Sequence, residues 1–127
     1  MDITVWVDHW QMQCCGKPFS RGSQVAWTLG PADPEWLQAV LGANRQQTVD
    51  AAEEHHGGVP EDTVPTEGTV IWIAAVHCRF APKPSGDSRT LYPVPDSGTL
   101  TEVDSADGWT ADRGDEKFTG YLVRLGL

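Results

Sequence analysis

The segment that decides the fold is residues 69–80, with the sequence TVIWIAAVHCRF. Its central part, residues 70–76, is almost continuously apolar and rich in β-branched side chains. Such a run is typical of a central strand that is buried on both faces of a sheet. We therefore expect this segment to form the middle of a β-structure, with the rest of the chain arranged around it.

The N-terminal segment, residues 3–12, is a second predicted strand because it is rich in β-branched and aromatic residues. In an extended chain, successive side chains point to opposite faces. Trp6 and Trp10 therefore lie on the face opposite Val5 and Val7. Both faces of this strand are then partly covered, as in a small closed or nearly closed barrel.

Further strands are predicted where apolar residues alternate and turn residues bound the segment. Residues 24–29 place Val25, Trp27 and Leu29 on one face and end at Gly30-Pro31. Residues 46–56 are compatible with a helix or a strand, and we favour a strand. The remaining predicted strands are residues 91–94, 98–103 and 118–125, and residues 57–68 are a predicted loop.

One short helix is predicted at about residues 34–42. Asp33 is suited to cap its N-terminus, and Pro34 is suited to the first helical position. Gly42 is a typical helix end. The buried face consists of Trp36, Leu37, Val40 and Leu41.

These elements define a mainly β fold. The chain has 127 residues and a globular composition, which fits a single domain over residues 1–127. We expect a small barrel or a strongly curved antiparallel sheet of about five to seven strands, with the one helix.

The charge balance excludes some partners. Nine Lys and Arg face 18 Asp and Glu, and the net charge is −9. No two basic residues are adjacent, so neither nucleic acid nor an anionic membrane surface is an expected partner. The start, Met1-Asp2-Ile3-Thr4, lacks the features of a signal peptide. We expect a soluble, cytoplasmic protein.

The three cysteines are predicted to be free thiols, since an odd count without an export signal is typical of a reducing compartment. Cys14 and Cys15 are neighbours, and a bond between them would need a strained ring. We favour the interpretation that one of them packs as a small apolar residue in a turn.

A zinc site is one alternative for the cysteines. Cys14-Cys15 and His77-Cys78 supply thiolates and an imidazole, the ligands that zinc prefers. Adjacent side chains of an extended chain point apart, so at most one residue of each pair is expected to join a common site. A further histidine would complete it, from His9, His55 or His56. Otherwise we expect no cofactor.

A cysteine nucleophile is a second alternative, with His77 or His9 as base and Asp8 orienting it. The chain has no Gly-x-Ser-x-Gly, phosphate loop or His-Glu-x-x-His motif, so the common motif-bearing enzymes are excluded. Residues 53–56, EEHH, have groups for acid–base or metal chemistry, but a polar run before Gly57-Gly58 is more often a solvated strand end, which we favour.

Six tryptophans are unusual in a chain of this length. Trp27, Trp36 and Trp72 lie within apolar patterns and are predicted core residues. Trp6, Trp10 and Trp109 do not fit an inner face, and we predict them as ligand-binding residues. Aromatic rings among acidic residues suit a cationic or extended peptide partner. The alternative is that they cover the second face of a thin sheet.

The sequence also resembles a known family. The signature is WQMQCCGKPF at residues 10–19, followed by Gly22, Val25 and Trp27. Residues 55–57, 76–80 and 120–123 also fit. Over nearly its whole length the chain is similar to small actinobacterial proteins classed as a domain of unknown function. This resemblance implies no activity.

The leading hypothesis is therefore a non-catalytic binding or accessory module. Its expected partner is a protein or peptide of basic character. Zinc binding and a small cysteine enzyme are the alternatives, and the sequence does not determine the oligomeric state.

Overall fold

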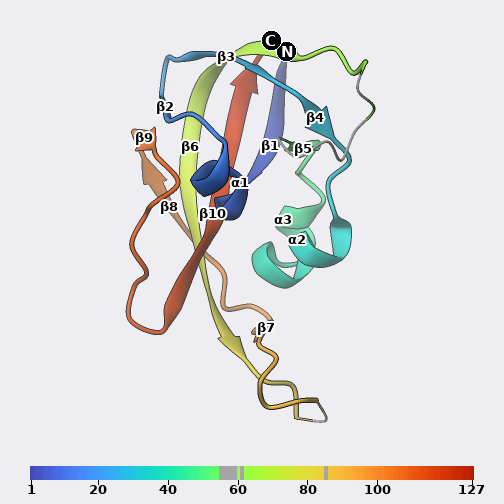
Figure 1. The fold of residues 1–127 in the computed structure, drawn as a ribbon, viewed down its shortest axis with the longest axis vertical. Coiled ribbons are helices and arrows are strands. Elements are labelled where there is room, and N and C mark those ends of the chain that lie inside the picture. Colours follow the sequence, from blue (N-terminus) through green and yellow to red (C-terminus); the bar gives the residue numbers. More distant parts are fainter. Residues whose placement is uncertain (55–59, 61, 85) are drawn as a thin grey trace.

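The computed structural model describes residues 1–54, 60, 62–84 and 86–127. His55, His56 and residues 57–59 and 61 of the predicted loop lie outside the described residues, whereas residues 66–68, the end of that predicted loop, belong to a strand. The mainly β prediction is confirmed: most of the regular structure is one strongly curved sheet, with both termini at the same end (Figure 1).

The long apolar segment is a central strand, as predicted. It forms β6 (Thr66–Ala81), the longest strand, which pairs with β10 (Glu116–Gly126) along one edge. Its other edge pairs successively with three shorter strands. These are β3 (Gln24–Trp27), β8 (Thr99–Val103) and β7 (Tyr92–Pro93).

The sheet curves into a nearly closed barrel because one stretch of chain supplies both of its ends. The strand order is β3-β6-β10-β1-β5-β4, with β1 (Asp2–Asp8), β5 (Ala51–Glu53) and β4 (Leu29–Gly30). Only Thr28 separates β3 from β4. The predicted strand at residues 24–29 is therefore extended but divided, since β3 pairs with β6 and β4 pairs with β5.

One pair departs from the predicted antiparallel arrangement. β1 and β5 are parallel, with Val5 opposite Ala51 and Trp6 opposite Ala52, whereas the other pairs are antiparallel. Parallel strands end at the same edge of a sheet. A small second sheet joins β2 (Phe19–Ser20) to β9 (Ser105–Ala106).

Apolar side chains bury both faces of the sheet. Alternate residues such as Val5 and Val7 enter a cluster inside the barrel, whereas Trp6 belongs to a second cluster on the outer face. The outer cluster is covered by α2 (Pro34–Leu41), whose Leu37, Val40 and Leu41 are buried. The predicted helix is thus confirmed, with Asp33 as its cap.

Two other short helices were not predicted. The predicted strand at residues 3–12 ends at Asp8, whose carboxylate accepts a hydrogen bond from the Trp10 amide and so starts α1 (His9–Cys14). The second is α3 (Ala43–Gln46). The predicted strand at residues 46–56 is confirmed at β5, Ala51–Glu53, whereas residue 46 belongs to α3. Among the described residues, no helix has both the length and the apolar character to cross a membrane.

Candidate functional site

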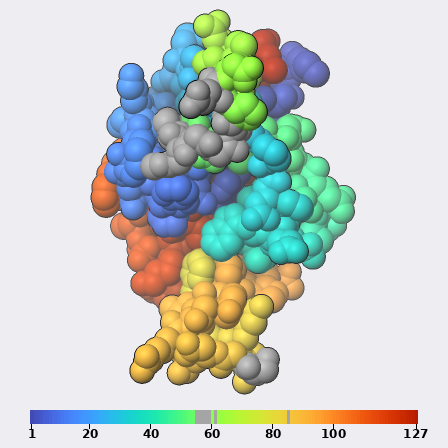
Figure 2. Space-filling model, turned by 45° about the vertical axis from the view of Figure 1, so that its right-hand side comes forward, coloured from blue at the N-terminus to red at the C-terminus, as the bar shows by residue number. Residues whose placement is uncertain are grey.

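The candidate site is a pocket of about 420 Å³ where β1, β5, α1 and α2 meet. Figure 2 shows this face, with the N-terminal segment in blue beside α2 in cyan. The lining combines aromatic rings with acidic side chains. The described lining residues are Trp6, Asp8, His9, Trp10, Gln11, Pro31, Asp33, Trp36, Leu37, Ala52, Glu53 and Glu54.

The parallel pairing of β1 and β5 explains the acidic part of the pocket. Because both strands end at one edge, Asp8 at the end of β1 comes close to Glu53 and Glu54 at the end of β5. Helix α2 begins at the same place, and its cap Asp33 adds a fourth carboxylate. Residues far apart in the sequence therefore place four acidic side chains around one hollow.

The tryptophans of the pocket come from three elements. Trp6 is only 3% exposed, and its indole Nε1 donates to Asp8 Oδ2 at 3.4 Å. Trp10 is 48% exposed at the start of α1. Trp36 also lines the pocket, while it packs against the outer cluster. The structure thus brings Trp6 and Trp10 together, as the ligand-binding hypothesis requires.

The other tryptophans lie elsewhere. Trp109 is 67% exposed and does not line this pocket. Trp27 is buried in the barrel, as predicted, and Trp72 is half-buried on the outer face. The sequence analysis placed Trp36 only in the core. Trp36 lies in the first turn of α2, three residues after the acidic cap Asp33, and this spacing indicated that the two side chains lie near each other.

Glu53 is the most perturbed acidic group of the pocket. Its side chain is buried, at 3% exposure, so a solvated strand end is the wrong description for it. Burial, together with the neighbouring charge of Glu54, raises the pKa of Glu53 from 4.5 to about 7. Glu54 is half-buried and accepts a hydrogen bond from Gln11 Nε2 at 3.1 Å.

His9 is the one basic residue among the described residues that line the pocket. Its Nδ1 donates to the Thr119 carbonyl at 2.8 Å and lies 3.2 Å from Asp8 Oδ1. The hydrogen bond to Asp8 raises the pKa of His9, and partial burial opposes this rise. The structure therefore forms the His9–Asp8 pair that the cysteine-enzyme hypothesis named.

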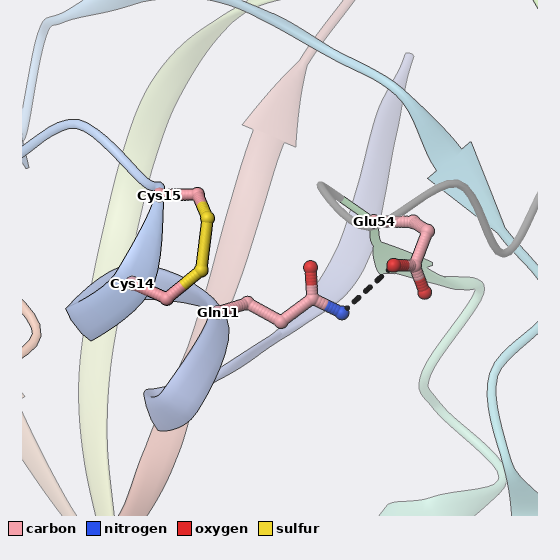
Figure 3. Close-up of a disulfide and its surroundings, with 4 residues drawn as sticks. All are labelled: Gln11, Cys14, Cys15 and Glu54. Carbon is pink, nitrogen blue, oxygen red and sulfur yellow. Dashed lines mark hydrogen bonds between the residues drawn. A yellow bond between two sulfur atoms is a disulfide. The ribbon is translucent and has the colours of Figure 1, made fainter.

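The prediction of three free thiols is wrong for two cysteines, because Cys14 and Cys15 form a disulfide (Figure 3). The prediction rested on the odd cysteine count without an export signal and on the strained ring that a bond between neighbouring cysteines needs. In the structure, α1 ends at Cys14, and Cys15 leaves the helix with φ −144° and ψ −13°. Only Cys78 is a free thiol among the described residues.

His77 and Cys78 lie on opposite faces of β6. His77 is fully buried, and its Nε2 donates to the Ala111 carbonyl at 2.8 Å. Cys78 belongs to the outer cluster, and burial raises the pKa of its thiol to about 11. In the described part of the chain, no three His, Cys, Asp or Glu side chains are grouped so that they could hold a metal ion. The zinc hypothesis stays a prediction.

The fold and the pocket thus define a small barrel-like β-protein with an acidic, tryptophan-lined hollow. The chain belongs to a family described as "Family of unknown function (DUF6578)", whose model matches residues 1–126. This match confirms the resemblance to a family of unknown function. No curated protein and no solved structure matches the chain.

Proposed function

We propose that this protein is a binding module for an organic cation, such as the ammonium or guanidinium group of a basic peptide. The observation that carries this proposal is one pocket that holds three tryptophans and four carboxylates. The proposal assigns no chemical step to the protein.

The sign of the ligand's charge follows from the charged groups around the pocket. Among the described lining residues, four acidic side chains face one titratable base, His9, so an anion would be repelled unless several acids were protonated. A cation gains attraction from the carboxylates and from the faces of aromatic rings. Trp10, with half of its surface exposed, is the ring most accessible to a ligand.

The size of the ligand follows from the pocket volume. About 420 Å³ lies within the range of small-molecule sites, roughly 300–1,000 Å³. The hollow therefore suits one small cation or one basic side chain. A peptide partner would insert a single Lys or Arg here, with its remaining residues on the surrounding surface.

Choline and 3,3-dimethylbutan-1-ol test the proposal, because they have nearly the same shape and differ in charge. We expect choline to bind at least about tenfold more tightly in calorimetric titrations, since only the cation gains from the rings and carboxylates. A peptide with one central lysine, compared with its norleucine counterpart, tests the peptide form of the ligand. Equal affinities within both pairs would contradict the proposal.

Two variants locate the binding site. Trp10→Ala should weaken choline binding about tenfold, within the range for losing a cation–ring contact. Trp109→Ala is the matched control, because Trp109 is exposed but outside the pocket, and it should bind choline as the wild type does. An equal loss in both variants would place the binding elsewhere.

A further inference from the structure

Cys14 and Cys15, which form the disulfide, are not among the described lining residues of the candidate pocket. Both residues are exposed at the C-terminal end of α1. The residue that follows is tightly packed, since a Cβ on Gly16 would lie 2.9 Å from the Cα of Met12. The disulfide therefore lies at the surface, on a helix whose Gln11 and Met12 are buried.

A chain of contacts connects this disulfide to the pocket. The amides of Cys15 and Gly16 both donate to the carbonyl of Gln11, at 3.0 and 2.9 Å. The side chain of Gln11 donates in turn to Glu54, which lines the pocket (Figure 3). Gln11 therefore connects the backbone at Cys15 directly to Glu54 in the pocket wall.

We propose that Cys14 and Cys15 form a redox site that undergoes thiol–disulfide exchange with a small dithiol, and that Gln11 transmits its state to the pocket. The second part deepens the proposed binding function and rests on it, whereas the exchange itself does not.

The exchange is balanced by the dithiol. One thiolate of the dithiol attacks a sulfur of the Cys14–Cys15 bond, forms a mixed disulfide and releases the other cysteine as a thiolate, which takes up a proton. The second thiol of the dithiol, as its thiolate, then attacks the dithiol sulfur in the mixed disulfide. This step closes the dithiol into a ring and releases the cysteine that was bonded to it, which takes up a proton. Two electrons and two protons pass to the protein, and the dithiol becomes a disulfide.

Cys78 does not compete in this exchange. It is fully buried in the outer cluster under α2, away from an external thiol. Its raised pKa, about 11, also keeps it as the unreactive thiol form. The exchange is therefore confined to the two exposed residues at the end of α1.

Reduction should loosen the end of α1. The disulfide ring restricts the backbone at Cys15, whose amide is one of the two that donate to the Gln11 carbonyl. Helix α1 has six residues, and helices of this length depend on tertiary contacts for their stability. Without the ring, Gln11 is held less firmly, and its hydrogen bond to Glu54 weakens.

The redox site is tested without any ligand. Protein purified without reductant is alkylated under native conditions, before and after dithiothreitol, and analysed by mass spectrometry. We expect no alkylated cysteine before reduction, two after it, at Cys14 and Cys15, and faster amide hydrogen exchange across α1. Alkylation of Cys14 and Cys15 before reduction, or a disulfide that dithiothreitol opens only in unfolded protein, would overturn the proposal.

The transmission to the pocket is tested with choline as probe. We expect the reduced wild type to bind choline about tenfold more weakly than the oxidised protein, the effect of losing one hydrogen bond to a charged group. The double variant Cys14→Ala/Cys15→Ala should match the reduced protein whether or not reductant is present. Gln11→Met should remove the redox dependence while Cys14 and Cys15 still exchange.

The two proposals fail in different ways. If oxidised protein does not bind choline, the binding function fails, and the alkylation result still decides the redox site. If Cys14 and Cys15 exchange but choline affinity is the same in both states, transmission through Gln11 is overturned.

Discussion

The molecule holds two groups of aromatic side chains that differ in their surroundings. Inside the barrel, Phe19 packs against Trp27 with ring centroids 5.0 Å apart, and Phe118 packs against Tyr121 at 4.9 Å. These rings are almost fully buried and belong to the inner apolar cluster, although Phe118 also packs against the rings of His9 and His77. In the pocket, Trp6, Trp10 and Trp36 are accompanied by four carboxylates. The residue type alone therefore does not separate core from candidate site; the neighbouring charges do.

The strongest test of this contrast is a charge placed in the barrel. Ile73→Asp should unfold the domain, because an unpaired charge in a fully buried position costs more than a typical total stability of about 5–15 kcal/mol allows. Circular dichroism and thermal denaturation measure the effect. Ile71→Asp, on the same strand at a 44% exposed position, is the control and should remain folded. A folded Ile73→Asp protein would contradict the inner core described here.

In the pocket, replacing the acidic side chain of Glu53 should raise the stability of the protein at neutral and alkaline pH. The pKa of Glu53 is raised from 4.5 to about 7, so the folded state holds a proton that the unfolded state releases. The contribution of this bound proton to the free energy of unfolding is fully present below pH 4.5 and is lost as the pH rises to about 7. Glu53→Gln lacks this loss, and above pH 7 it should be more stable than wild type by about 3 kcal/mol.

Denaturant unfolding at pH 4 and pH 8, for wild type and Glu53→Gln, measures this difference. His9, whose pKa is also raised, is present in both proteins and cancels in the comparison. A constant difference between the two proteins at both pH values would show that Glu53 is not buried as described.

The cysteines provide a third comparison, between an exposed pair and a buried thiol. Replacing Cys15 by Ala removes the disulfide, and replacing Cys78 by Ala leaves a small cavity; each change should cost at most about 1–3 kcal/mol. In a double-mutant cycle the two effects should add to within about 0.5 kcal/mol, with no effect of chelator. Strong coupling together with chelator sensitivity of the wild type would instead support the zinc hypothesis.

The smallest expected effect concerns the cap of α2. Asp33 accepts hydrogen bonds from the amides of Glu35 and Trp36. Asp33→Ala should cost about 1 kcal/mol of stability, and Asp33→Ser should restore most of it. Denaturant unfolding checks both values. A loss in Asp33→Ala that Asp33→Ser does not restore would mean that the carboxylate has a role beyond capping.

Local patterns were sufficient for the elements that depend on a few neighbouring residues. The apolar run of β6 indicated a central strand, and the Asp33, Pro34 and Gly42 positions defined α2 almost to the residue. The same reasoning failed at residues 9–14. There a β-rich sequence continues into a helix because the carboxylate of Asp8 caps it, and a local alternation pattern does not weigh that hydrogen bond against strand pairing.

The sequence by itself determined the mainly β class, the one longer helix and the surplus of acidic and tryptophan residues. Only the tertiary structure decided which of these residues meet. The parallel pairing of β1 with β5 and the closure through β3 and β4 bring Asp8, Asp33 and Glu53 to one edge. Strand pairing between distant segments depends on the whole set of buried surfaces and backbone hydrogen bonds, and periodicity within a single segment carries no information about it.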